Sequence, residues 1–233
     1  MKKRWFLKAE LAVLVCVACI WAVKSATIDL DSVKAAVLKQ VVKVDQDNVE
    51  AYHFLAAYYD RSHDFEKAAE FRKKLVRIEP NESQAWNDLG DAYASSGYYK
   101  EAIPAYKKAA QLAPDWPWPH VCLAHTYKDM HRYNEAVEEW TQVIKCEPNC
   151  AGLYVLLAES YSKAGQYDNA ISACKHAIHL DPKHKQAHYH LGEAYLQVDS
   201  KDLALKEYKI LKTVDDKLAN DLFGLIEGHT SNP

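Results

Sequence analysis

The sequence predicts an all-α solenoid of five helix-turn-helix repeats, each 34 residues long, with a capping helix at each end. Two columns of residues with this period predict the fold. Proline recurs at Pro80, Pro114, Pro148 and Pro182, and tyrosine at Tyr59, Tyr93, Tyr127, Tyr161 and Tyr195. Between them, apolar residues recur three, four and seven apart over two stretches of about a dozen residues, which is typical of two amphipathic helices.

The five repeats span residues 49–82, 83–116, 117–150, 151–184 and 185–218. Small residues in register, which let paired helices approach closely, form two columns: Ala56, Gly90, Ala124, Ala158 and Gly192; then Ala68, Ala102, Ala136, Ala170 and Ala204. Gly97 and Gly165 are expected to end the first helix of their repeats, and each proline to end the second, because proline lacks the backbone donor that would extend the helix.

The second repeat resembles the tetratricopeptide repeat family most closely, through Trp86, Leu89, Gly90, Tyr93, Ala102, Tyr106, Ala109 and Pro114. The resemblance covers residues 49–218 and implies a right-handed superhelix of helix pairs with a concave groove lined by the first helices. Several residues depart from the motif: His120 and His188 replace the leading aromatic, Arg72 and Cys174 replace a later one, and Lys201 breaks a further aromatic column. These departures are expected to weaken single repeats without disturbing the register.

The segments that flank the repeats read as end caps. Residues 25–48 are predicted to form a short linker and an N-capping helix over 31–44, a leftover second helix. Residues 214–228 show an apolar stripe with acidic and polar residues off it, which predicts a C-capping helix, and 229–233 are expected to be a frayed tail.

Residues 1–24 have the pattern of a targeting segment, because Lys2, Lys3 and Arg4 precede an uncharged apolar run over 11–23. Its length favours a signal peptide, whereas the poor cleavage site favours an uncleaved membrane anchor with a transmembrane helix. A lipid-bearing Cys19 is a third reading. All three predict that the repeats face out of the cytoplasm, in the periplasm if the source is bacterial, with membrane contact through this segment.

The charge balance argues against nucleic acid as a partner. Without residues 1–24, which contain five basic and one acidic residue, 24 basic and 31 acidic residues remain. No helix shows the basic stripe with interleaved aromatics that nucleic-acid binding needs. The chain also lacks a phosphate-binding loop, a zinc-binding histidine pair or a nucleophile elbow, so we predict no enzyme activity and no cofactor.

Cysteine and histidine leave alternatives open. Cys146 and Cys150 flank a turn and could form a disulfide in an exported protein, or remain free like the helical Cys122 and Cys174. Five histidines gather around one turn, where a zinc or copper site competes with a solvated turn: His176, His179, His184, His188 and His190. No ligand spacing is diagnostic, so no metal site is assigned.

The predicted function is a protein-protein interaction scaffold that binds a protein or peptide in the concave groove. The second, fifth, ninth and twelfth positions of the first helices are expected to line it. The assigned residues are Asn87, Asp91, Trp118, Val121, His125, Val155, Glu159, Tyr189 and Glu193. Apolar residues beside acids suit a peptide with apolar anchors and a basic residue or two. The competing reading is that these side chains pack against neighbours or form a solvated face.

Two narrower functions remain open. Exported repeat proteins that resemble this one serve as assembly factors for envelope machinery, such as pilus secretin pilotins or chaperones of apocytochrome maturation. A metal-binding or redox module at the histidine-rich turn, together with Cys146 and Cys150, is the other. Binding of a chaperone tail by a carboxylate clamp is disfavoured, because no Lys-x-x-x-Asn or Lys-x-x-x-Arg pair occurs in the first helices.

Overall fold

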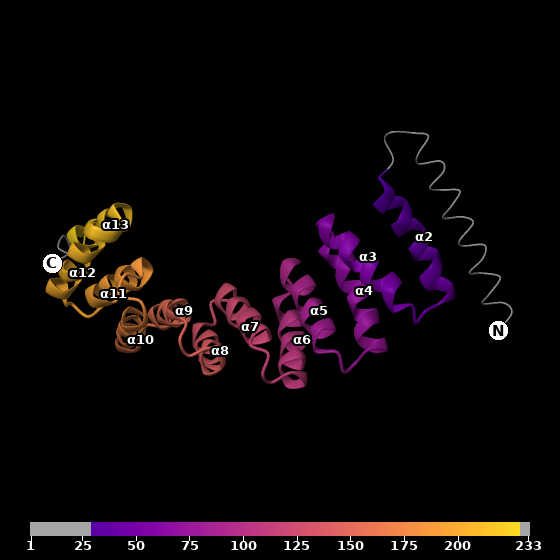
Figure 1. The fold of residues 1–233 in the computed structure, drawn as a ribbon, viewed down its shortest axis with the longest axis horizontal. Coiled ribbons are helices and arrows are strands. Elements are labelled where there is room, and N and C mark those ends of the chain that lie inside the picture. Colours follow the sequence, from indigo (N-terminus) through magenta and orange to yellow (C-terminus); the bar gives the residue numbers. More distant parts are fainter. Residues whose placement is uncertain (1–28, 229–233) are drawn as a thin grey trace. The chain divides into compact units, whose positions relative to one another are not determined.

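The computed structural model describes residues 29–228, which form twelve α-helices and no strand (Figure 1). The all-α repeat fold predicted from the sequence is therefore confirmed. The predicted targeting segment 1–24 and the tail 229–233 lie outside the described residues. None of the helices within 29–228 is both long enough and apolar enough to cross a membrane.

The described chain forms two compact units, the first ending at Ala113 and the second beginning at Pro114. The first unit contains α2 (Leu30–Val44), α3 (Val49–Arg61), α4 (Phe65–Ile78), α5 (Ser83–Ser95) and α6 (Tyr99–Leu112). The second contains α7 (Trp118–Asp129), α8 (Tyr133–Cys146), α9 (Ala151–Lys163), α10 (Tyr167–Leu180), α11 (Lys185–Gln197), α12 (Lys201–Val214) and α13 (Asp216–Gly228). Each predicted repeat holds one helix pair.

The turn inside every repeat places one residue in the left-handed backbone region. Glycine takes this place at Gly97 and Gly165, with φ of 78° and 74°, as expected for the end of a first helix. The other three repeats use non-glycine residues with φ between 54° and 58°: His63, His131 and Asp199. Since a side chain is strained in this region, those three turns are less favourable than the glycine turns.

The prolines end the second helices as predicted. Helices α4 and α6 stop two residues before Pro80 and Pro114, and α8 and α10 stop two residues before Pro148 and Pro182. The residue before a proline is pushed out of the helical region, so the chain turns there into the next repeat.

The two small-residue columns lie where helices touch. All five alanines of the second column are fully buried. A Cβ on Gly90 of α5 would come within 2.5 Å of the Tyr106 ring of α6, and one on Gly192 of α11 within 2.5 Å of a Leu222 methyl of α13. The absence of a Cβ therefore permits both close contacts, and α13 packs closely on the last repeat.

Helix α2 is in register with the second helices of the repeats. Lys39 of α2 lies 4.9 Å from the ring centroid of Tyr59 in α3. The same cation-aromatic contact joins Lys73 to Tyr93 at 5.2 Å and, in the other unit, Lys175 to Tyr195 at 5.8 Å. These lysines share one position of the 34-residue period, so α2 takes the place of the second helix of a preceding repeat.

The C-capping helix begins later than predicted. Val214 is the last residue of α12, Asp215 caps that helix, and α13 starts at Asp216. Asp215 also accepts hydrogen bonds from the backbone amides of Lys217 and Leu218, both at 3.1 Å. Because the Asp215 carboxylate caps the first turn of α13, it fixes the boundary between α12 and α13.

Candidate functional site

The candidate binding face of the second unit is built on the first helices α7, α9 and α11. The Nζ of Lys128 in α7 lies 2.8 Å from Oε1 of Glu159 in α9, which joins these two helices. Helices α9 and α11 are in direct contact. Residues at matching positions of the three helices therefore follow one another across this surface.

The apolar residues assigned to this face differ in accessibility. Trp118 is 52% exposed, whereas Val121 and Tyr189 are partly buried against the core. The assignment of Val155 to the groove is wrong: it is 7% exposed and packs with Ala177 and Ala187. The small alanines allow the neighbouring helices to close over the valine. Trp118 is thus the most accessible apolar side chain of the face.

The acids of the face already have partners. Glu159 is paired with Lys128, and Oε2 of Glu193 lies 2.8 Å from Nδ1 of His190. Burial, followed by the charge of Glu193, raises the pKa of Tyr189 to about 12. Because the Glu159 carboxylate is paired with an ammonium group of the protein, it attracts a basic ligand less than an isolated acid would.

His125 lies edge-on to Trp140, with 5.1 Å between ring centroids. Desolvation, together with the nearby Lys128 ammonium, lowers the pKa of His125. The indole Nε1 of Trp140 is buried without a hydrogen-bond partner among the described residues. His125 is consequently a neutral, flat side chain near neutral pH, suited to apolar contact.

The two assigned residues of the first unit belong to an internal polar cluster. Asn87 is 1% exposed, and its Nδ2 donates to Asp91 at 3.2 Å. The Tyr106 hydroxyl donates to the other oxygen of Asp91 at 2.8 Å. The placement of Asn87 on an accessible groove is therefore wrong, because the helix pair buries it, while Asp91 remains partly exposed.

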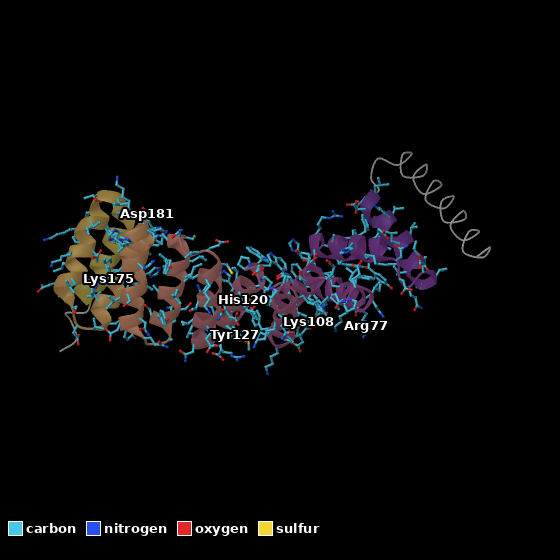
Figure 2. All side chains as sticks on the ribbon, turned by 60° about the horizontal axis from the view of Figure 1, so that its bottom comes forward. Arg77, Lys108, His120, Tyr127, Lys175 and Asp181 are labelled. Carbon is cyan, nitrogen blue, oxygen red and sulfur yellow. The ribbon has the colours of Figure 1, made fainter. Side chains whose placement is uncertain are left out.

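Two histidine-glutamate pairs escaped the sequence analysis. His120 of α7 (labelled in Figure 2) lies 2.6 Å from Glu139 of α8, and His188 of α11 lies 2.7 Å from Glu207 of α12. Both pairs join the fourth and twenty-third positions of their repeats. Repeats two and four carry an aromatic residue and an alanine at these two positions, Trp86 with Ala105 and Tyr154 with Ala173. In repeats three and five both positions differ together, and this joint change was the signal in the sequence that could have revealed the pairs.

The imidazole of His188 also takes over the polar contact of the aromatic it replaces. Its Nε2 lies 3.0 Å from the Pro182 carbonyl, as Trp86 Nε1 donates to the Pro80 carbonyl at 2.9 Å and the Tyr154 hydroxyl to the Pro148 carbonyl at 3.0 Å. Both ring nitrogens of His188 face acceptors, so the hydrogen bond to Glu207 raises its pKa. The replacement of the aromatic residue by His188 therefore adds a buried hydrogen bond between α11 and α12.

Two further departures from the motif, Arg72 and Cys174, are also compensated. Arg72 of α4 makes a two-point contact with the carboxylate of Asp60 in α3, with 3.2 Å between Nη1 and Oδ1. Cys174 is completely buried as a small core residue, and burial raises its pKa to about 12. A cross-helix ion pair and a close-packed thiol thus replace the aromatic ring.

The histidine-rich turn does not assemble a ligand set. The rings of His176 and Tyr154 lie in tilted contact, with 4.2 Å between ring centroids. The His184 side chain accepts a hydrogen bond from the backbone amide of Ala187 at the start of α11. Within residues 29–228, no three histidine, cysteine or acidic side chains come close enough to hold a metal ion. Cys146 and Cys150 are exposed free thiols.

Family models match most of the repeat region. A model described as TPR repeat matches residues 90–131, and two models of the tetratricopeptide repeat match 123–182 and 161–220. Together they cover more than half of the chain. The chain belongs to the tetratricopeptide repeat family. A comparison of this tetratricopeptide repeat (TPR) protein with curated protein sequences finds no match.

Solved TPR structures share the fold. MamA from Desulfovibrio magneticus RS-1 is 23% identical, with a TM-score of 0.64, over 72% of this chain and 96% of that one. Another MamA structure is 24% identical, with a TM-score of 0.65, over 74% and 94% of the two chains. YrrB, described as a TPR protein with an unusual peptide-binding site, is 18% identical, with a TM-score of 0.64, over 80% and 97%.

Proposed function

We propose that this TPR protein is a scaffold that binds a protein or peptide partner on the face formed by α7, α9 and α11, and that it has no catalytic activity of its own. The exposed Trp118 at the start of α7 carries the proposal, because exposed aromatics beside an apolar surface are typical anchors of binding sites. The peptide-binding site named for YrrB, which shares the fold, is consistent with it.

The chemistry of this face favours a partner with apolar anchors. Trp118, Val121 and Tyr189 offer apolar area, and the lowered pKa of His125 keeps that ring neutral near neutral pH. Since Glu159 is already paired with Lys128, a basic residue of the partner that approaches it adds selectivity more than affinity.

The location outside the cytoplasm is part of the same proposal. It rests on the basic cluster and apolar run of residues 1–24, a pattern typical of an export signal or an anchor. Protease treatment of intact cells or spheroplasts, followed by mass spectrometry of the protein's N-terminus, tests this. Digestion of the repeats in intact spheroplasts supports it, whereas repeats that are cut only after lysis contradict it.

Crosslinking in cells tests the binding face. The full-length protein, Trp118→Ala and the Trp118→Ala, Tyr189→Ala double variant are compared by pull-down and mass spectrometry. Tyr98→Ala is the matched control, since Tyr98 is 44% exposed but lies in the other unit. A partner lost in both Trp118 variants and kept in the control supports the proposal. Equal capture by all four proteins contradicts it.

Melting curves accompany these captures, because Tyr189 packs partly against the core. Trp118→Ala alone is expected to leave the melting temperature unchanged, since the side chain is largely exposed. It therefore separates lost binding from lost stability.

A further inference from the structure

Two exposed cysteines flank the turn that joins the third repeat to the fourth. Cys146 is the last residue of α8, and Cys150 immediately precedes α9. Both are free thiols, and every residue from 145 to 150 is exposed. The pair is therefore open to reagents in solution, unlike Cys174, which is completely buried in the same unit.

The turn between the two helices is short. Pro148 and Asn149 are its central residues, between Glu147 and Cys150. The α-carbons at the two ends of such a four-residue turn lie less than about 7 Å apart. Cys146 directly precedes this turn, and a disulfide needs about 4.4 to 6.8 Å between its two α-carbons. The span of the turn is thus comparable to the distance that a disulfide bridges.

Contacts with the flanking helices hold the turn in place. The Tyr154 hydroxyl of α9 donates to the Pro148 carbonyl at 3.0 Å, and the Glu147 amide donates to the Val143 carbonyl of α8 at 3.0 Å. A Cβ placed on Gly152 would lie 3.9 Å from Sγ of Cys150. Because glycine leaves this space open, the Cys150 side chain has room to change rotamer.

Neither cysteine has the role that its position has elsewhere in the chain. The last residue of the other second helices, and of α2, is aliphatic: Val44, Ile78, Leu112, Leu180 and Val214. At the position of Cys150, the side chains of Asn48 and His184 cap the helices that follow them, whereas Cys150 makes no capping hydrogen bond. Both positions change together at one turn, which indicates that the two thiols act as a pair.

We propose that Cys146 and Cys150 form a reversible disulfide by exchange with an external disulfide. The thiolate of one cysteine attacks a sulfur atom of the external disulfide, which forms a mixed disulfide and releases one thiolate. The thiolate of the other cysteine then attacks the protein sulfur of the mixed disulfide, and the second external thiolate leaves. The protein loses two protons and two electrons, and the external disulfide is reduced to two thiols.

The short loop and its exposure make this bond reversible. Three residues separate the cysteines, so closure restricts the unfolded chain less than a long loop would and adds little stability. An exposed disulfide is also open to attack by thiols. The proposed location outside the cytoplasm would supply oxidants, although the exchange itself does not depend on that location.

Oxidation of the folded, full-length protein in non-ionic detergent tests the proposal. The reduced protein is incubated with oxidised glutathione, its remaining thiols are blocked with N-ethylmaleimide, and tryptic peptides are mapped by mass spectrometry. Trypsin cleaves after Lys145 and Lys163, so one peptide, residues 146–163, holds both cysteines. We expect this peptide to escape blocking and to lose about 2 Da, the mass of two hydrogen atoms. Excess reduced glutathione should restore both thiols.

Single substitutions distinguish a bridge from two independent thiols. In Cys146→Ser and in Cys150→Ser the remaining cysteine has no partner, so the 146–163 peptide should keep one glutathione as a mixed disulfide. Cys122→Ser is the matched control, because it retains the pair and should form the bridge as the wild type does. Circular dichroism of the reduced and oxidised proteins should show equal helical content, since the turn lies outside both helices.

Each of four results would overturn the proposal. The first is stable glutathione on both cysteines of the wild type, which would show that the thiols do not reach one another. The second is a disulfide that joins the 146–163 peptides of two molecules. The third is a bridge that forms only in denaturant. The fourth is a peptide whose two cysteines stay reduced in oxidised glutathione.

Discussion

The Nδ1 atom of His188 lies 2.7 Å from Oε2 of Glu207, and this contact is buried between the two helices of the last repeat. The ring is 3% exposed, and its other nitrogen faces the Pro182 carbonyl at 3.0 Å. The charged imidazolium satisfies both acceptors, so folding favours the protonated form.

This pair makes the stability of the second unit depend on pH. Because the pKa of His188 is raised in the folded state, the stabilisation is complete below the unfolded value of about 6.5 and is lost as pH rises through the folded pKa. Chemical unfolding of wild type and Glu207→Gln at pH 5.5 and pH 9 measures it. We expect a larger stability difference between the two proteins at pH 5.5; a constant difference would contradict the linkage.

The double variant His188→Tyr, Glu207→Ala gives the last repeat the aromatic-alanine pair of repeats two and four. It is expected to be more stable than the two single losses of stability predict. His188→Tyr alone leaves Glu207 buried without its partner, and Glu207→Ala alone leaves the Nδ1 atom of the imidazole without its acceptor, so each destabilises. The double variant should lose less than the sum of both single losses. Additive losses in denaturant unfolding would show that the two side chains act independently.

Gly90→Ala is expected to destabilise by about 1 to 3 kcal/mol, because the new Cβ would overlap the buried ring of Tyr106. Gly224→Ala is the control, since a Cβ there meets nothing within 4 Å and α13 gains a better helix former. Thermal unfolding measures both. An unchanged melt for Gly90→Ala would contradict the close contact of α5 and α6.

The turns respond to substitution in opposite directions. Gly97→Ala should destabilise by about 1 kcal/mol, because alanine is strained at a φ of 78° although the space around it is open. Asp199→Gly should stabilise by up to about 1 kcal/mol at a φ of 54°. Denaturant midpoints measured for both variants test this, and a shift of the same sign in both would refute it.

Pro104→Ala is expected to stabilise the first unit. Pro104 lies inside α6, is exposed, and leaves the carbonyl of Lys100 without an amide donor from the next turn. Restoring that bond should raise the free energy of unfolding by about 1 to 3 kcal/mol. Thermal denaturation with circular dichroism measures the change, and a lower melting temperature would argue against it.

Thiol labelling should separate the cysteines. Cys146 and Cys150 are exposed, whereas Cys174 is completely buried with a pKa raised to about 12. At pH 8, after reduction, iodoacetamide should modify the first two within minutes and Cys174 only on unfolding. Peptide mass mapping reads the sites. Rapid labelling of Cys174 in the folded protein would contradict its burial.

The fold was predictable because every repeat solves the same packing problem with the same residue types. One column of alanine lets the helix pairs approach, and one column of proline ends the second helices, so register alone gives the elements. The start of the C-capping helix was predicted two residues too early, because Val214 continues the apolar stripe across Asp215. Only the hydrogen bonds of the Asp215 side chain mark the boundary between α12 and α13.

The candidate site was less predictable, because register gives the direction of a side chain but not its exposure. Val155 was assigned correctly to its helix position, yet the neighbouring Ala177 and Ala187 are small enough to let the helices bury it. The sequence predicted that His188 weakens its repeat, because it replaces an aromatic residue. Its partner Glu207 is nineteen residues away on another helix, so the pair was not predicted. Such contacts depend on two positions changing together.

The alternation of turn residues has a consequence for the order of folding. Each unit contains one repeat whose hairpin closes through glycine, at Gly97 in the first and Gly165 in the second. The neighbouring hairpins must force histidine or aspartate into a costly conformation before their helices can pair. We expect each unit to nucleate at its glycine repeat and to grow outward from there, with the terminal helices joining last.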